Sequence, residues 1–397
     1  MKTVALGDVL EIISGFAFKS SHFNEAGNGL PLIRCRDVNT GFSGTYYDGP
    51  YDDQFLVNNG DLLVSMDGDF RTIRWANGTA LLNQRVCKLE PYRNRLHPAY
   101  LLFFLPKELE KIHGKTAFAT VKHLSARSIQ EIEIPLLPLD EQKWIAAILD
   151  KADAIRRKRA AALRLADDFL QSAFLDMFGD PVANPNGWPT INFESAAPAK
   201  GQIVDGPFGS SLKPESYVDS GIRVIRNFNI GDDNFDESDY KFVTPEKFQE
   251  IKRSEVVPGD LLISTKGTIG NVCQMPELPG KSVLSASGTV RIRLGKKTEI
   301  RPLFVVVQMI TPQFKRYLKQ FQAGTNQKYL NLSAIRKIQL VVPPLDLQDR
   351  FLTIRQKVRQ SKKRGDQAFR ESESFFNSLA RRAFRGEPSL CPSPPSP

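Results

Sequence analysis

The chain is 397 residues long, which favours two domains over a single core. Hydrophobic residues make up 41% of it and charged residues 25%, values typical of a globular protein. No apolar run approaches the roughly 18 residues of a membrane span, and the first residues lack the pattern of a secretory signal, so we expect a cytoplasmic protein. The net charge of +10 and the pI near 9.3 favour a polyanionic partner such as nucleic acid, although charge alone is weak evidence.

The four cysteines lie far apart in the sequence. They form no Cys-x-x-Cys pair, and no histidine stands at a metal-ligand spacing from them. The sequence therefore predicts neither a zinc site nor a disulfide framework, and we expect ordinary reduced thiols. The four are Cys35, Cys87, Cys273 and Cys391.

Residues 1–138 form the first predicted globular domain. Short apolar segments are separated there by Gly, Asn, Asp and Pro, a pattern that indicates strands joined by turns. Residues 60–65, for example, place Gly-Asp before the apolar run Leu-Leu-Val-Ser. We expect a mixed α+β domain with a strand-rich face.

Residues 139–179 are predicted to form one long helix. The segment contains no proline from Asp140 onwards, and its apolar residues recur at alternating steps of three and four, with a second apolar row beside them. About forty residues at 1.5 Å each give a rod of roughly 60 Å, which suits a spacer or an assembly surface. A helix packed only on its own domain is the alternative.

The second half of the chain follows the same order. Residues 180–342 hold a linker rich in Pro, Asn and Gly and then a second globular domain, and residues 343–386 are predicted to form a second long helix. Gly179 and Gly386 suit the helix ends, because glycine adopts the left-handed cap conformation. The tail at residues 387–397 is mostly Pro and Ser, so we expect it to be disordered.

Each half is a copy of one unit. The run Gly-Asp-Leu-Leu-Val-Ser at residues 60–65 returns as Gly-Asp-Leu-Leu-Ile-Ser at residues 259–264. The apolar residues of residues 124–142 are answered at the same spacing in residues 330–348, and both segments end in Pro-Leu-Asp-x-Gln. The repeat therefore predicts two similar domains, each followed by a similar helix.

Common catalytic motifs are missing. Residues 280–282, Gly-Lys-Ser, resemble the end of a phosphate-binding P-loop, but Met275 stands where the first glycine of that motif belongs and two prolines interrupt the loop. Asn-Pro-Asn at residues 184–186 lacks the second proline and the aromatic residue of amino-methylating enzymes. All four histidines lie in the first half, so a histidine-based acid/base mechanism would make the two halves unlike. A binding function is favoured over catalysis.

A signature of the form Ile-x-Ile-x-x-x-Pro-Leu-x-x-Gln closes each globular domain. It stands at residues 132–142 as Ile-Glu-Ile-Pro-Leu-Leu-Pro-Leu-Asp-Glu-Gln and at residues 338–348 as Ile-Gln-Leu-Val-Val-Pro-Pro-Leu-Asp-Leu-Gln. A variable domain, this signature, a long helix and then the whole unit again cover nearly the entire chain. This doubled plan resembles the specificity subunit of type I restriction-modification systems.

The resemblance implies a non-catalytic subunit that binds double-stranded DNA. Each globular domain would be a target-recognition domain that reads one half of a bipartite asymmetric site, and the helices would form an antiparallel coiled coil that sets the spacer. Two methyltransferase (modification) subunits and the motor/nuclease (restriction) subunits would be its partners. The chain itself would bind no cofactor and no metal, and S-adenosylmethionine, ATP and Mg²⁺ would be bound by the partners. The fold class is then α+β, with two pseudo-repeated mixed α/β domains joined by the two helices.

Candidate DNA-binding residues follow from their position in the repeat. Arg, Lys, Asn and Gln on loops can read bases in the major groove, and Lys, Arg, Ser and Thr can contact phosphates. For each candidate an exposed polar loop residue is an equally good interpretation, but Lys122 and Lys328 are favoured because they recur in register. The candidates in the first half are Lys19, Arg34, Arg36, Asn39, Arg71, Arg74 and Lys122. Those in the second half are Lys213, Arg226, Asn227, Asn229, Lys266, Thr268, Asn326, Gln327 and Lys328.

Apolar residues of the two helices are the candidates for partner binding, because an exposed apolar stripe favours association. Two other functions stay open. One is a coiled-coil adaptor that joins protein partners with incidental DNA binding, and the less favoured one is a nuclease or methyltransferase that acts alone. The candidate partner-binding residues are Ile145, Leu149, Leu163, Leu170, Phe351, Val358, Phe375 and Leu379.

Overall fold

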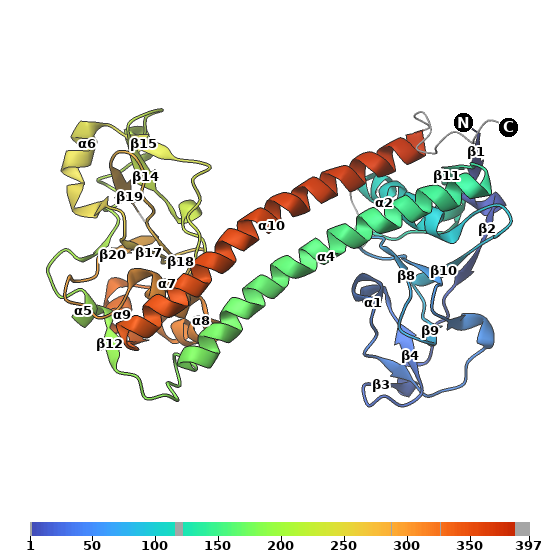
Figure 1. Ribbon diagram of the computed structural model, residues 1–397, viewed down its shortest axis with the longest axis horizontal. Helices are drawn as coiled ribbons and strands as arrows, with labels where there is room; N and C mark the ends of the chain where they lie inside the picture. Colours follow the sequence, from blue (N-terminus) through green and yellow to red (C-terminus); the bar gives the residue numbers. More distant parts are fainter. Residues whose placement is uncertain (1, 116–121, 287, 326, 386–397) are drawn as a thin grey trace. The chain divides into compact units, whose positions relative to one another are not determined.

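The computed structural model describes residues 2–115, 122–286, 288–325 and 327–385. The predicted disordered tail at residues 387–397 lies outside the described residues. The chain divides into two compact units (Figure 1): unit 1 is Met1–Ala162 with Gly365–Pro397, and unit 2 is Leu163–Arg364. Each long helix therefore contributes one part to each unit, whereas the sequence predicts the helices as segments separate from the domains.

The described residues of unit 1 form three β-sheets. A four-stranded antiparallel sheet has the order β2-β10-β7-β8, a five-stranded sheet has the order β3-β5-β4-β9-β6 with β4 and β9 parallel, and β1 pairs with β11. The strands are β1 Thr3–Ala5, β2 Leu10–Ser14, β3 Phe23–Asn24, β4 Leu30–Ile33, β5 Tyr46–Tyr47, β6 Leu56–Val57, β7 Leu62–Ser65, β8 Thr72–Arg74, β9 Ala80–Leu82, β10 Val86–Pro91 and β11 Glu133–Pro135. The helices are α1 Cys35–Thr40, α2 Pro98–Lys115, α3 Ala126–Gln130 and the first half of α4 Leu139–Phe178.

The part of unit 2 that the structure describes also forms three sheets. Their strand orders are β13-β20-β17-β18, β15-β14-β19-β16 with β14 and β19 parallel, and β12-β21. The strands are β12 Thr190–Asn192, β13 Ile203–Asp205, β14 Ile222–Ile225, β15 Lys241–Val243, β16 Glu255–Val256, β17 Leu261–Ser264, β18 Val272–Gln274, β19 Ser282–Leu284, β20 Thr289–Ile292 and β21 Gln339–Val341. The helices are α5 Phe193–Ala196, α6 Pro245–Glu250, α7 Pro302–Ile310, α8 Pro312–Leu318, α9 Leu332–Lys337 and the first half of α10 Leu345–Arg385.

The two units share one topology. The sheet β2-β10-β7-β8 corresponds to β13-β20-β17-β18, the pair β1-β11 to β12-β21, and the parallel pair β4-β9 to β14-β19. The predicted fold class, an α+β chain with two pseudo-repeated domains and two long helices, is confirmed. The repeat in the sequence is therefore a repeat of the fold.

The repeated Gly-Asp pair makes the turn that enters the central strand of each unit. Gly60 and Gly259 have φ of +99° and +89°, a left-handed conformation that glycine adopts without steric cost. The carboxylates of Asp61 and Asp260 each accept a hydrogen bond from the backbone N–H three residues earlier, at 2.8 Å in both units. The Gly-Asp pair is repeated in the sequence because each unit needs the same turn.

The repeated glutamine of Pro-Leu-Asp-x-Gln is a buried clamp in the first turn of each long helix. Gln348 has no exposed surface, its amide nitrogen donates to the carbonyls of Glu299 and Pro343 at 2.9 and 2.7 Å, and its oxygen accepts from the N–H of Arg301 at 2.9 Å. Gln142 makes the equivalent three bonds in unit 1. These bonds hold the start of α10 against the segment that leads into α7, and the start of α4 against the segment that leads into α2.

The two long helices run antiparallel within each unit. In unit 1 the guanidinium of Arg156 lies 4.7 Å from the ring centroid of Phe376, and Arg159, three residues later on α4, donates to the carbonyl of Ala368, earlier on α10. In unit 2 Asp167 pairs with Lys362 at 2.6 Å, and Phe174 contacts Phe351 at 5.6 Å between ring centroids. Residue numbers thus fall along α10 as they rise along α4, as the resemblance implied. Among the described helices, α4 and α10 included, none has an apolar stretch long enough to cross a membrane.

Each core is completed by parts of both long helices. In unit 1 the ring of Phe384, near the end of α10, packs against Tyr100 and Phe104 of α2 with centroids 5.1 and 5.3 Å apart. In unit 2 the last turns of α4 supply Phe174 to a fully buried cluster that includes Phe351 of α10, at 5.6 Å. Burial of such rings contributes roughly 1.5–3 kcal/mol each, so the helices are part of the cores.

Candidate nucleic-acid interface

Loops that are distant in the sequence meet on one side of each unit. In unit 2 they are residues 226–229 after β14, residues 265–270 between β17 and β18, Gly288 before β20, and residues 327–330; this set is called the unit-2 loop cluster. In unit 1 they are residues 34–36 after β4, residues 65–71 between β7 and β8, Arg85 before β10, and residues 122–124; this set is called the unit-1 loop cluster. Hydrogen bonds within each unit define both clusters.

In the unit-2 loop cluster one residue connects three loops. The N–H of Thr265 donates to the carbonyl of Gly288 at 2.7 Å, and the N–H of Leu330 donates to the carbonyl of Thr265 at 3.0 Å. The side-chain amide of Asn227 donates to the carbonyl of Lys266 at 3.1 Å. The structure thus brings together Asn227, Lys266 and the Lys328 segment, three of the predicted positions.

The unit-1 loop cluster has the same backbone bonds. The N–H of Met66 donates to the carbonyl of Arg85 at 2.8 Å, and the N–H of Leu124 donates to the carbonyl of Met66 at 2.7 Å. The thiol of Cys35 donates to the same Arg85 carbonyl at 2.6 Å, and burial raises the pKa of this thiol, which keeps it a neutral donor. Met66, Arg85 and Leu124 therefore occupy the places of Thr265, Gly288 and Leu330.

Most candidates of unit 1 are exposed. Arg71 lies within the loop cluster, 3.7 Å from Asp69, and Arg36 donates to the hydroxyl of Thr45 at 3.1 Å while most of its side chain stays in solvent. Arg34 is half-buried and precedes α1. The other exposed candidates are Lys19, Asn39 and Arg74.

Lys122 and Lys328, the two lysines that recur in register, lie in different surroundings. The side chain of Lys122 is half-buried, and its ammonium donates to the carbonyl of His113 at 2.7 Å, near the C-terminal end of α2. A cation there is stabilised by the helix dipole, so this lysine is part of the scaffold in unit 1. Lys328 is exposed, and the register that the two lysines share does not give them the same surroundings.

Asn229 is buried, whereas the sequence predicted it on a DNA-contacting loop surface. It has no exposed surface, and its amide donates to the carbonyls of Asp236 and Asp239 at 2.8 and 2.9 Å while its oxygen accepts from the N–H of Arg226 at 2.9 Å. It stabilises the turn after β14 and is covered by that turn. Its neighbour Arg226 is half-buried, pairs with Asp239 at 2.6 Å and lies over the exposed ring of Phe228.

The remaining unit-2 candidates are placed as follows. Thr268 is exposed in the loop between β17 and β18, with its hydroxyl 3.2 Å from that of Ser264. Lys266, Gln327 and Lys213 are exposed, and Lys213 precedes the short turn Pro214–Ser216. Asn326 lies outside the described residues. None of these placements tests DNA contact, so the candidates stay predictions.

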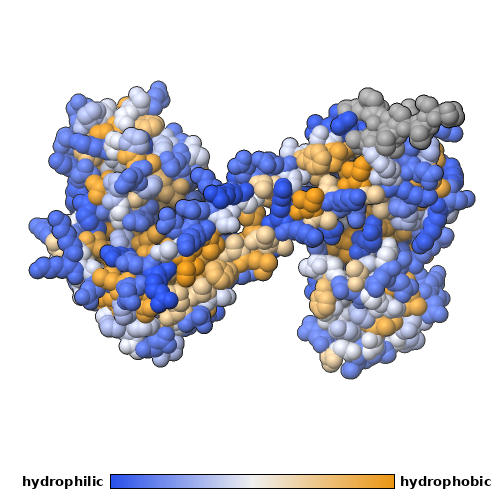
Figure 2. Space-filling model, in the orientation of Figure 1, coloured by the Kyte–Doolittle hydropathy of each residue, from blue (hydrophilic) through white to orange (hydrophobic). Residues whose placement is uncertain are grey.

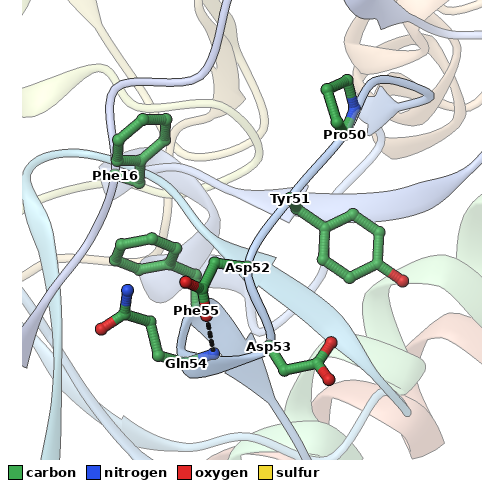
Figure 3. A pocket seen from close by; sticks show the side chains of 7 residues that line it. All are labelled: Phe16, Pro50, Tyr51, Asp52, Asp53, Gln54 and Phe55. Carbon is green, nitrogen blue, oxygen red and sulfur yellow. Dashed lines mark hydrogen bonds between the residues drawn. The ribbon is translucent and has the colours of Figure 1, made fainter.

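A shallow depression of about 690 Å³ in unit 1 is lined by Phe16 and residues 50–55 (Figure 3). Phe16 and Phe55 point to one side of the segment 50–55, with ring centroids 5.1 Å apart, whereas Tyr51 and Asp53 point to the other. The carboxylate of Asp52 accepts from the N–H of Gln54 at 3.0 Å. Because two carboxylates border this depression, it is unfavourable for a phosphate.

The comparisons with known proteins agree on one family. The model of the type I restriction modification DNA specificity domain matches residues 1–164 and 227–363. The chain is 30% identical to the type I restriction enzyme EcoBI specificity subunit of Escherichia coli, covering 97% of this chain and 85% of that one.

The chain belongs to the type I specificity subunits. It is also 19% identical to the MjaVIII specificity subunit of Methanocaldococcus jannaschii, covering 95% of this chain and 91% of the relative. The crystal structure of the S subunit from M. genitalium has the same fold, with a TM-score of 0.58 at 15% identity over 98% and 96% of the two chains. The function of this specificity subunit is DNA sequence specificity, and the coiled-coil adaptor is not favoured.

The helices of the specificity subunit correct part of the predicted partner surface. Ile145, Leu149 and Leu379 are buried in the core of unit 1, and Phe351 is buried in the core of unit 2, so their side chains are covered by the chain itself. The spacing of apolar residues along α4 and α10 identified the apolar face of each helix correctly, but these residues of that face pack into the domain cores. The candidates that are not buried are Leu163, Leu170, Val358 and Phe375, and Phe375 is 59% exposed.

Sequence reasoning missed three residues of the unit-1 loop cluster. Nδ1 of His123 lies 2.8 Å from a carboxylate oxygen of Asp67, and Nη1 of Arg85 lies 3.3 Å from both ring nitrogens of the same imidazole. Arg85 also has φ of +71°, where its counterpart Gly288 has +79°. The alignment of an arginine with a glycine was the available signal, since the left-handed region is costly for any residue with a Cβ.

Among the described residues no cluster of three or more potential metal ligands is found.

Proposed function

We propose that each unit of this specificity subunit reads one half of a bipartite, asymmetric site in double-stranded DNA. The observation that carries the proposal is the pair of loop clusters, which share their backbone bonds and differ in their side chains. Arg85 and Asp67 stand in unit 1 where Gly288 and Lys266 stand in unit 2. Equal scaffolds with unequal side chains suit the reading of two different sequences.

The helices are proposed to set the spacer between the half-sites. Two readers on continuous helices touch DNA at points separated by a fixed number of base pairs, and α4 and α10 have 40 and 41 residues without a break. The partners are proposed to be two modification subunits and the restriction subunits. S-adenosylmethionine, ATP and Mg²⁺ would then be bound by those partners, and this chain would be non-catalytic. Because DNA is the ligand, we place its action in the cytoplasm.

Exposed apolar residues on α4 support a protein partner there. Leu165 is 66% exposed and Phe169 is 52% exposed, and a separation of four residues places them on the same face of the helix. Figure 2 shows hydrophobic colour along α4 on the visible face. A chain from a structural study of complex assembly in the type I R-M system shares the fold, with a TM-score of 0.51 at 16% identity over 97% and 98% of the two chains.

The test of the proposed function is methylation mapping in a host that expresses this chain with its modification subunits. We expect one bipartite sequence with an unspecified spacer, and an insertion of a few residues at matching heights of α4 and α10 should change the tolerated spacer. A single continuous short site would contradict the two-reader proposal.

The partner surface is tested separately by co-purification. Leu165→Asp with Phe169→Asp should reduce the amount of modification subunit recovered with the chain, because charges would replace apolar contacts. Gln171→Asp is the matched control, since Gln171 is also exposed on α4 but faces away from these two. Equal recovery with all variants would place the partner elsewhere.

A further inference from the structure

Arg85 is held in an unfavourable backbone conformation by two hydrogen bonds to its carbonyl. Its φ of +71° lies in the left-handed region, and its carbonyl accepts hydrogen bonds from the Met66 N–H and the Cys35 thiol. A non-glycine residue persists in this region where its surroundings over-determine it, and such residues gather at functional sites. The side chain of Arg85 nevertheless stays 55% exposed.

The guanidinium of Arg85 is oriented by two side chains from other loops of the unit-1 loop cluster. Nδ1 of His123 lies 2.8 Å from a carboxylate oxygen of Asp67, and Nη1 of Arg85 lies 3.3 Å from both ring nitrogens of the same imidazole, which places it over the face of the ring. The Nε of Arg85 lies 3.8 Å from the second carboxylate oxygen of Asp67. Contacts with His123 on one side and Asp67 on the other orient the planar fork of Arg85 while part of it faces solvent.

The carboxylate beside Arg85 decides between a phosphate and a base as its ligand. Asp67 is 29% exposed, so an approaching phosphate would be repelled by it. The O6 and N7 atoms of guanine are neutral acceptors that match the arginine fork, and a carboxylate accepts from the N4 amino group of cytosine. Arg85 and Asp67 together are therefore complementary to a G·C pair in the major groove.

We propose that Arg85 is a specificity-determining residue of unit 1 and reads a guanine of the first half-site, with Asp67 and His123 as its positioning residues. The proposal rests on the proposed function, because it needs unit 1 to read one half of the DNA site. Gly288 occupies the equivalent place in unit 2, so the second half-site is read there by other side chains.

The experiment uses the full chain assembled with its modification subunits and DNA that carries the mapped site. Arg85→Gly should fold with unchanged Tm, since glycine is free of strain at this φ. It should lose discrimination at one G·C pair of the first half-site on the order of 10- to 100-fold, the effect of one bidentate base contact. Arg85→Lys keeps the charge but not the fork and should lose the same discrimination.

A 7-deazaguanine probe identifies the contact atom. Replacing that one guanine by 7-deazaguanine removes N7, so the wild type should bind on the order of 10-fold more weakly while Arg85→Gly should bind both DNAs equally. His123→Ala should lower discrimination at the same base pair and at no other, which a structural role would not produce. Arg93→Ala is the matched control, because this exposed arginine lies beyond the far end of β10, roughly 20 Å away.

The results separate the two proposals. The inference about Arg85 is overturned if Arg85→Gly keeps the wild-type preference at every position, if Arg85→Lys behaves as the wild type, or if the loss of affinity is equal on unrelated DNA. Failure of the proposed function would instead be seen with the wild type, as the absence of a bipartite site.

Discussion

The unit-1 and unit-2 loop clusters have the same backbone bonds and different side chains. Through backbone hydrogen bonds, Met66 connects Arg85, which precedes β10, to Leu124, which precedes α3. Thr265 connects Gly288, which precedes β20, to Leu330, which precedes α9, in the same way. Around this shared frame unit 1 places Arg85 where unit 2 has Gly288, and Phe70 where unit 2 has Gly270, and all four have positive φ. The frame is maintained by main-chain hydrogen bonds, so the side chains on it are free to differ.

Phe70 and Arg85 of unit 1 both have left-handed backbone conformations, and their side chains lie in different surroundings. The ring of Phe70 is buried against His113 of α2, which explains its place in unit 1 as packing. Arg85 is exposed and packs into no core, so its conformation has no such explanation. Arg85 therefore differs from the equivalent Gly288 by an exposed, charged side chain at a position where glycine would be free of strain.

The largest expected effect comes from breaking a feature that both units share. Gln348→Ala should lower the free energy of unfolding by about 3–5 kcal/mol, because it removes three buried hydrogen bonds and leaves their backbone partners unpaired. Gln142→Ala should have a similar effect through unit 1. Chemical denaturation followed by circular dichroism measures both.

Gln356→Ala is the control for these variants, because Gln356 lies exposed on α10. It should change the unfolding free energy by less than about 0.5 kcal/mol. If Gln348→Ala were as mild as this control, the clamp would not hold the start of α10.

A smaller effect should distinguish the equivalent positions 85 and 288. Gly288→Ala should destabilise the protein by about 1–2 kcal/mol, because φ is +79° and the new Cβ would lie 2.3 Å from the side-chain nitrogen of Asn227. Arg85→Gly should change stability by less than about 1 kcal/mol. Thermal unfolding of both variants measures this contrast, and equal costs at the two positions would contradict the assignment of strain to Arg85.

The smallest expected effect separates the two lysines of the repeat. Lys328→Ala should reduce the salt dependence of DNA binding by about 0.9 in the log–log slope if Lys328 contacts one phosphate. Lys122→Ala should leave the slope unchanged and lower stability by about 1 kcal/mol, because it removes the hydrogen bond to the His113 carbonyl. A salt titration of both variants against the wild type tests whether their shared register means a shared role.

The architecture could be predicted because its causes are local. The repeated Gly-Asp turn needs the residues that make a left-handed turn, and the two long helices need a proline-free segment of steady apolar period. The candidate site could be predicted only in part. Asn229 and Lys122 have the right chemistry, but burial and the partners that cover them depend on segments far along the chain.

The same limit explains the residues that were missed. Asp67, Arg85 and His123 belong to three loops and meet only after the sheet has formed. The partner surface was misjudged for a related reason, since an apolar stripe gives the same period whether it packs on its own domain, as Ile145 does, or faces solvent, as Phe169 does. DNA contact by the other candidates stays a prediction.

The way the last turns of α10 enter the core of unit 1 has a consequence for synthesis of the chain. Unit 2 is one continuous segment, so it can fold as soon as residue 364 has left the ribosome. Unit 1 cannot cover Tyr100 until Phe384 has been made, so its apolar α2 face stays open during most of translation. The domain that is synthesised first is therefore the one that is completed last, and a nascent chain paused before α10 would be vulnerable to aggregation through unit 1.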